Sequence, residues 1–152
     1  AAAAGHTVVL QWLLSLAESG RDLLKRRALG GISVAHAAAR DNRVKVLRWI
    51  LNTPALGITL LIAVRKNGWT IAHEAAAAGH TVVLQWLLSL AESGRDLLKR
   101  RALGGISVAH AAARDNRVKV LRWILNTPAL GITLLIAVRK NGWTIAHEAA
   151  AA

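Results

Sequence analysis

Histidine is the side chain in this sequence best suited to chemistry at neutral pH, because its proton exchanges near pH 7. Four of the six histidines, His36, His73, His110 and His147, are spaced by 37 residues. Each follows a hydroxyl residue, and these partners are Ser33, Thr70, Ser107 and Thr144. An imidazole here could act as a base or bind a metal. Histidines one repeat apart would lie about 10 Å from each other, however, which is too far to share a metal at bonds of about 2 Å.

Acidic side chains are too sparse to support general acid–base catalysis. The first half of the sequence has Glu18, Asp22, Asp41 and Glu74, and no two of them form an obvious catalytic pair. The chain has no cysteine, and its L-G-G-I stretches lack the phosphate-binding pattern G-x-x-x-x-G-K-[ST]. We predict that the protein is not an enzyme and that it uses no cofactor, metal or small-molecule substrate.

Cationic side chains outnumber acidic ones, with 20 Lys and Arg against 8 Asp and Glu for a net charge of +12. This balance suits a well-solvated surface, but it could also attract nucleic acid or another polyanion. The basic residues include two K-R-R segments at 25–27 and 99–101. No basic–aromatic alternation typical of single-strand binding occurs. Nonspecific polyanion binding is therefore an alternative. With no membrane-spanning run and no signal-peptide pattern, we expect a cytoplasmic protein that does not bind membranes.

Internal repetition organises the chain. Residues 1–78 are identical to residues 75–152, so the sequence comprises two 74-residue units plus four alanines. Each unit divides at its histidines into two variants of a 37-residue repeat. Identity this complete favours a designed, idealised or consensus-like sequence over a recent duplication. We predict a single repeat array over residues 1–152, with partial repeats at both ends.

Each repeat predicts a pair of helices. Gly68 permits a turn, and Thr70 is the predicted N-cap of a short Ala-rich helix over residues 71–78, which Gly79 ends. Residues 81–90 have apolar side chains at a spacing of three and four, which predicts a second helix. A pair this small cannot bury its apolar face alone, so stacked neighbours must cover it. This favours an all-α, or mainly α, solenoid.

The connections between the helix pairs leave two structures open. Gly94 is predicted to end the second helix, and Ser93 followed by Asp96 suggests a capping box beyond it. The segments at 92–105 and 130–142 could then form either extended, hairpin-like fingers or an extra helical turn.

One segment resembles a known family. The sequence G-W-T-I-A-H-E-A-A-A-A-G-H-T-V-V-L-Q-W-L-L at 68–88 is similar to an ankyrin repeat, and the second variant matches through residues such as Gly105 and Leu121. Departures are Ile71-Ala72 in place of the family's Pro-Leu, and four residues beyond the usual period of about 33. The resemblance implies stacked helix–turn–helix repeats in which Ser or Thr and the histidine tie each turn to a neighbouring repeat.

The resemblance also implies a noncatalytic scaffold that binds proteins. The candidate partner-binding residues are Trp69, Trp143, Glu74, Arg40 and Arg114. The two tryptophans occupy a turn position that varies in the family and often binds partners, although each could instead pack across the preceding turn. The remaining tryptophans lie within predicted second helices, where core packing is expected.

The two ends of the sequence suggest another function. Residues 1–4 match the end of a first helix, and residues 145–152 match a first helix without its partner helix. Natural solenoids close their ends with polar repeats. Complementary, uncapped ends therefore predict head-to-tail self-association into a continuous superhelix or filament as an alternative.

Overall fold

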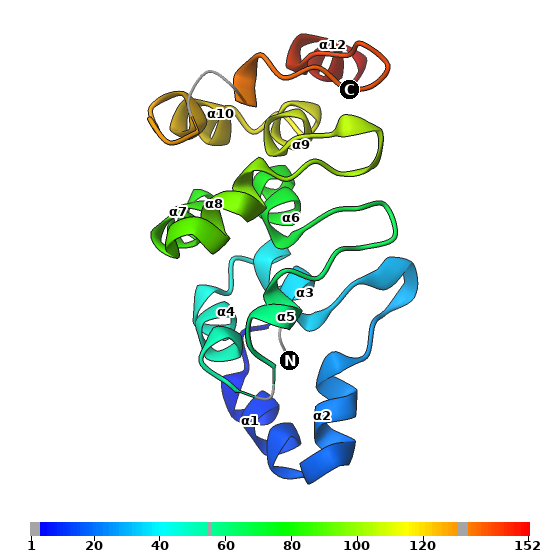
Figure 1. The fold of residues 1–152 in the computed structure, drawn as a ribbon, viewed down its shortest axis with the longest axis vertical. Helices are drawn as coiled ribbons and strands as arrows, with labels where there is room; N and C mark the ends of the chain where they lie inside the picture. The colour runs from blue at the N-terminus through cyan, green and yellow to red at the C-terminus, as the bar shows by residue number, and fades with distance from the viewer. Residues whose placement is uncertain (1–3, 55, 131–133) are drawn as a thin grey trace.

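The computed structural model describes residues 4–54, 56–130 and 134–152, and within these ranges it contains helices and no β-strand. The helices stack in layers from α1 (Thr7–Ser15) at one end to α12 (Ile145–Ala151) at the other (Figure 1). The predicted mainly α solenoid is confirmed.

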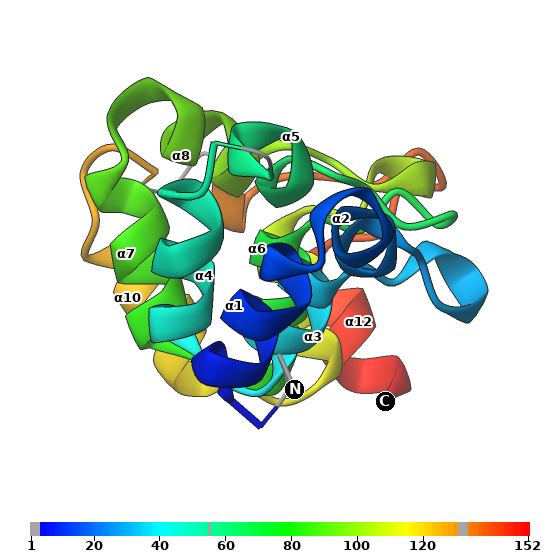
Figure 2. The same ribbon diagram turned by 90° about the horizontal axis from the view of Figure 1, so that it is seen from below.

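Two columns of helices form the stack (Figure 1), and Figure 2 shows the molecule from below, along these columns. The inner column consists of α3 (Val34–Arg40), α6 (Ile71–Ala78), α9 (Val108–Arg114) and α12, and each contacts the next. The outer column consists of α1, α4 (Val44–Leu51), α7 (Thr81–Ser89) and α10 (Val118–Leu125), again with successive contacts. The inner helices α3, α6 and α9 also contact the outer helices that follow them, so these layers pack on their own partner helix and on their neighbours.

Residue size explains the two columns. The inner helices bury alanines such as Ala35, Ala75 and Ala109, whose small side chains let neighbouring backbones approach closely. The outer helices bury larger side chains, among them Leu47 and Leu84. Buried residues from both columns form one continuous cluster along the stack. The described residues therefore share one elongated core cluster rather than a separate core for each repeat, and Trp69, Ala102 and Ala111 form a small second cluster.

The predicted helix limits are largely confirmed. Thr70 is the N-cap of α6, and its side chain accepts a hydrogen bond from the backbone N–H of Ala72 at 3.2 Å. Gly79 ends α6 in the left-handed conformation with φ +82°, and Asn116 adopts φ +60° after α9. Both residue types tolerate that conformation, which lets the chain reverse into the outer helix.

The connections contain a third helix, which resolves the alternatives left open above. These helices are α2 (Ala17–Lys25), α5 (Gly57–Leu61) and α8 (Ala91–Lys99). The prediction that Gly94 ends the second helix is wrong, because α7 ends at Ser89 and Gly94 lies inside α8. The capping box at Ser93 is wrong as well, since the N-cap of α8 is Leu90 and makes no side-chain cap bond.

Beyond the third helix, the chain also forms fingers. The short 3-10 turns η1 (Leu29–Gly31) and η2 (Leu103–Gly105) are flanked by extended backbone, and the fingers project from the same side of the stack (Figure 1). Among residues 1–4, for which a helix end was predicted, only Ala4 is described. The segment 130–142 is described except for residues 131–133.

Candidate functional site

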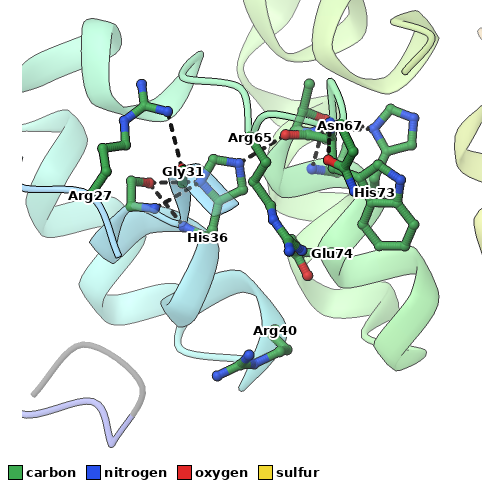
Figure 3. Close-up of polar contacts among 12 residues, drawn as sticks. Arg27, Gly31, His36, Arg40, Arg65, Asn67, His73 and Glu74 are labelled. Atoms are coloured by element: carbon green, nitrogen blue, oxygen red, sulfur yellow. Dashed lines mark hydrogen bonds and ion pairs between the residues drawn. The ribbon is translucent and has the colours of Figure 1, made fainter. Parts of the chain in front are cut away.

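The histidine of each inner helix links two repeats. The backbone N–H of Ser33 donates to His36 Nδ1 at 3.3 Å, and the Ser33 hydroxyl lies 2.8 Å from the same nitrogen. Because Nδ1 accepts a backbone N–H, the ring proton is on Nε2, which donates to the Trp69 carbonyl oxygen at 3.0 Å. The Ser33–His36 pair therefore caps its own helix and holds the turn of the next repeat (Figure 3).

The same geometry recurs along the stack. His73 Nε2 donates to the Ile106 carbonyl at 2.9 Å, and His110 Nε2 donates to the Trp143 carbonyl at 3.1 Å. Their caps are Thr70 and Ser107, which lie 3.0 Å and 2.7 Å from the respective Nδ1 atoms. His147 keeps its Thr144 contact at 2.9 Å but is exposed.

Burial keeps the imidazoles of His36, His73 and His110 neutral. Desolvation lowers the pKa of His73 from 6.5 to about 4, against a smaller raising effect of the Ile106 carbonyl. Desolvation likewise lowers the pKa of His36 and His110, with the Trp69 and Trp143 carbonyls opposing it. A neutral imidazole with one nitrogen accepting and the other donating is fully used in hydrogen bonds. This arrangement suits cross-bracing rather than proton transfer to a ligand.

A second link joins the fingers that precede α6 and α12 to those inner helices. Arg65 Nη1 lies 2.5 Å from Glu74 Oε1, and Arg139 repeats the ion pair with Glu148 at the same distance. Glu74 is buried, and Figure 3 shows the Arg65 side chain extending toward it. Glu74 therefore neutralises Arg65 instead of standing free for a partner.

Trp69 packs across the turn. Its ring lies between His73, at 5.8 Å between ring centroids, and the Arg114 guanidinium, whose Cζ is 5.0 Å from the ring centroid. Only 6% of Trp69 is exposed. Trp143 stacks on His147 and lies 5.8 Å from Arg139 Cζ, and it is half-buried. A ligand at Trp69 would therefore meet the Arg114 guanidinium above the ring rather than the ring itself. The cation–π contact between the two contributes about 0.5–2 kcal/mol.

Four of the five candidate partner-binding residues line one groove. Arg40, Trp69, Glu74 and Arg114 surround a cavity of about 420 Å³, together with Asn67 and other residues. The Asn67 side chain accepts a hydrogen bond from the Trp69 backbone N–H at 3.0 Å, which fixes the turn at the groove's edge. Trp143, the fifth candidate, lies at the corresponding turn of the last repeat, away from this groove. Arg40 and Arg114, both exposed, come from the inner helices on either side of α6. Arg40 Nε lies 4.0 Å from Asp41 Oδ1, and the Arg114 guanidinium lies over the Trp69 ring.

The groove brings two arginines, a tryptophan and a buried ion pair together on one cavity. Within the described ranges, no cluster of three or more His, Cys, Asp or Glu side chains is placed to hold a metal ion. None of the described helices has the length and apolar character needed to cross a bilayer. A ligand in the groove would meet the exposed guanidinium groups of Arg40 and Arg114. The groove is also lined by buried Trp69 and by Glu74, whose charge Arg65 neutralises.

Comparison with known families decides the classification. A family model described as ankyrin repeats (three copies) matches residues 1–101. The chain belongs to the ankyrin repeat family. No curated protein matches it. Residues 102–152 fall outside the family match, but they are identical to residues 28–78, which lie within it. Ankyrin repeats are generally protein–protein interaction modules and typically noncatalytic.

Sequence reasoning missed Arg65, which lines the groove, and Arg139, which is its counterpart beside Trp143 in the last repeat. A signal was present, because Glu74 and Glu148 are the only acidic residues in their Ala-rich helices. A carboxylate on a helix that must be buried requires a cation nearby. Arg65 and Glu74 lie on opposite sides of a turn, however, so helical periodicity could not identify Arg65 as the cation that pairs with Glu74.

Proposed function

We propose that this ankyrin-repeat chain is a noncatalytic scaffold that binds another protein through the groove around Trp69. The observation that carries the proposal is the convergence of side chains from three successive repeats on one cavity: Arg40, Trp69 with Glu74, and Arg114. The two exposed guanidinium groups can form paired hydrogen bonds with carboxylates or backbone carbonyls of a partner. The exact identity of the two 74-residue units supports a designed or idealised origin for the scaffold.

The test is to select peptides from a displayed library against the unmodified chain and to measure their affinity for two variants. Arg40→Ala/Arg114→Ala removes the groove's exposed cations, and Arg48→Ala/Arg122→Ala removes two exposed cations from the outer helices. Selected peptides should lose at least about tenfold in affinity for the groove variant and little for the outer variant. Equal affinity for both variants would remove the groove from the proposal. Arg114→Lys keeps the charge and separates its effect from loss of the guanidinium.

A second candidate function is head-to-tail self-association, and a comparison of identical segments favours it. The sequence of α1 is the same as that of α7, yet Trp12 is 60% exposed whereas Trp86 is 8% exposed. Within the stack, α7 contacts α4 on one side, and α10 has the sequence of α4. Leu125 of α10 is 55% exposed, whereas its copy Leu51 in α4 is partly buried against the core.

The α10 end of one copy can therefore receive the α1 end of another copy by repeating the α4–α7 contact. Such a heterologous contact does not close and produces linear assemblies. Sedimentation velocity over a wide concentration range tests this function, and a constant monomeric coefficient at the highest concentration would rule it out.

A further inference from the structure

We propose that the finger side of the stack has a second binding surface, which takes an acidic protein segment that also carries apolar side chains. It shares with the proposed function the premise of a protein partner, but it uses residues outside the Trp69 groove. We call the surface the cationic strip, and it consists of Arg100, Arg101 and Lys140 with Val64, Leu103 and Val138.

The cationic strip borders a cavity of about 610 Å³ between successive connections. Its cations come from two connections, Arg100 and Arg101 from one and Lys140 from the next. No carboxylate is among the described lining residues. The Trp69 groove differs, because Glu74 and Asp115 line it alongside its arginines. The positive charge of the strip is therefore not balanced within its described lining, and it favours an external anion.

Apolar side chains stand exposed between these cations. Leu103 is 66% exposed and Val138 is 48% exposed. Leu103 and Lys140 occupy the same position in successive repeats, as do Leu29 and Lys66 before them, so apolar and cationic residues alternate from finger to finger. Leu29 is 94% exposed. A ligand that matches this surface must supply both negative charge and apolar contact.

The strip's central guanidinium is held in place before any ligand arrives. Arg101 Nη1 donates to the Val138 carbonyl at 2.7 Å and to the Gly105 carbonyl at 3.3 Å. Arg27 makes the equivalent bonds to Val64 at 2.6 Å and Gly31 at 3.1 Å, and Figure 3 shows its side chain beside Gly31. These bonds use one nitrogen of each guanidinium. A carboxylate that binds the remaining donors therefore loses less affinity to side-chain ordering.

The first K-R-R segment borders a comparable cavity. Lys25 and Arg27 line a space of about 500 Å³ together with Leu56, Leu60 and Ala63, which are buried. Its described lining again contains no carboxylate. Among the described residues, neither cation forms an ion pair. Cationic, carboxylate-free cavities with apolar walls thus accompany the K-R-R segments of both 74-residue units.

An acidic, apolar peptide segment matches the strip better than nucleic acid does. No aromatic side chain is among the described lining residues, so bases would have no stacking platform. A phosphate backbone would also leave Leu103 without an apolar contact. The surface is a cavity between projecting fingers, which suits an inserted chain better than a flat lipid headgroup layer. We therefore commit to a peptide with carboxylate and aliphatic side chains.

The experiment uses the full chain and a fluorescent synthetic peptide that alternates glutamate and leucine, with anisotropy as the readout. Arg100→Gln/Lys140→Gln should weaken binding at least about tenfold. The matched control Lys119→Gln/Arg122→Gln removes the same charge from exposed positions on α10 and should change affinity by less than about twofold. Leu103→Ser should also weaken binding of the peptide. Circular dichroism verifies that each variant is folded.

Companion ligands separate this surface from general charge attraction. A glutamate–serine peptide and a single-stranded oligonucleotide should bind more weakly than the glutamate–leucine peptide, and raised salt should abolish their binding first. Equal losses in the strip and control variants, or equal binding of all three ligands, would overturn the proposal. If only Arg40→Ala/Arg114→Ala weakened peptide binding, the peptide would bind in the Trp69 groove. That result would contradict the proposal for the cationic strip but would be consistent with the proposed function.

Discussion

Arg65 Nη1 lies 2.5 Å from Glu74 Oε1 and thereby ties a finger to the inner helix that follows it. The Glu74 side chain is 7% exposed and that of Arg65 is 24% exposed. A carboxylate on an otherwise apolar helix loses its hydration on folding and needs this cation. Because Arg139 and Glu148 repeat the contact, the ion pair belongs to the architecture of each unit rather than to a single binding event.

Removing the cation of this pair should destabilise the fold. Arg65→Ala should lower the free energy of unfolding by about 3 kcal/mol, since it leaves the Glu74 carboxylate buried without a counterion. Arg40→Ala provides the control, because Arg40 and Asp41 are 4.0 Å apart with side chains 54% and 39% exposed, and ion pairs in contact with solvent contribute about 0–1 kcal/mol. Urea unfolding followed by circular dichroism measures both values. Equal losses would show that the Arg65–Glu74 pair is no stronger than a surface pair.

Stability should fall as the pH drops below 6.5. Burial lowers the pKa of His73 from 6.5 to about 4, so the unfolded chain binds the proton more tightly than the folded chain does. The contribution of neutral His73 is thus complete above the unfolded pKa and is lost as the pH falls toward the folded one. For His73 alone the loss is on the order of 3 kcal/mol.

Urea unfolding between about pH 7.5 and pH 5 measures this dependence while most carboxylates stay ionised. His36 and His110 add to the slope, because burial lowers the pKa of each. His73→Gln should reduce the slope while lowering stability at pH 7.5 through loss of its cross-repeat hydrogen bond. A stability that does not change over this range, or an undiminished slope in the variant, would contradict the histidine account.

The close approach of α7 and α8 makes Gly94 intolerant of a side chain. A Cβ at Gly94 would lie 1.6 Å from the Leu87 carbonyl oxygen, and one at Gly20 would lie 1.5 Å from that of Leu13. Gly94→Ala should therefore cost about 1–3 kcal/mol through forced backbone displacement, even though alanine favours helices. Ser93→Ala, at an exposed position of the same helix, should change stability by less than about 0.5 kcal/mol. A stabilising Gly94→Ala would mean that helix propensity outweighs the contact.

The repeat, its helix pair and its caps could be predicted because they depend on local patterns. Thr70 and His73 lie within one helical turn, and the apolar spacing of residues 81–90 is helical on its own. The third helix could not be recognised, because Gly94 ordinarily signals a helix end and here serves close packing. Long-range partners could not be predicted either. Arg65, the cation that pairs with Glu74, is separated from it by a turn, and Arg114, which lies over the Trp69 ring, belongs to the next repeat.

The local sequence also could not predict how deeply identical residues of the two 74-residue units are buried. Leu97 in α8 is 2% exposed, whereas its copy Leu23 in α2 is 50% exposed. The difference follows from the neighbours, because α8 contacts α6. Two identical segments can therefore differ in exposure solely through their place in the stack.

Trp12 and Trp86 occupy identical positions but differ in exposure, so substituting each of them separately tests self-association. Trp12→Gln changes an exposed side chain and should leave the unfolding free energy nearly unchanged, whereas Trp86→Gln removes a core contact and should cost about 3–5 kcal/mol. If α10 of one copy covers α1 of another, Trp12→Gln should also shift the concentration of half-association upward by at least about tenfold in sedimentation velocity. Trp49→Gln supplies a second comparison, since Trp49 is partly buried against the core. Association that persists unchanged in Trp12→Gln would mean that the copies meet through another surface.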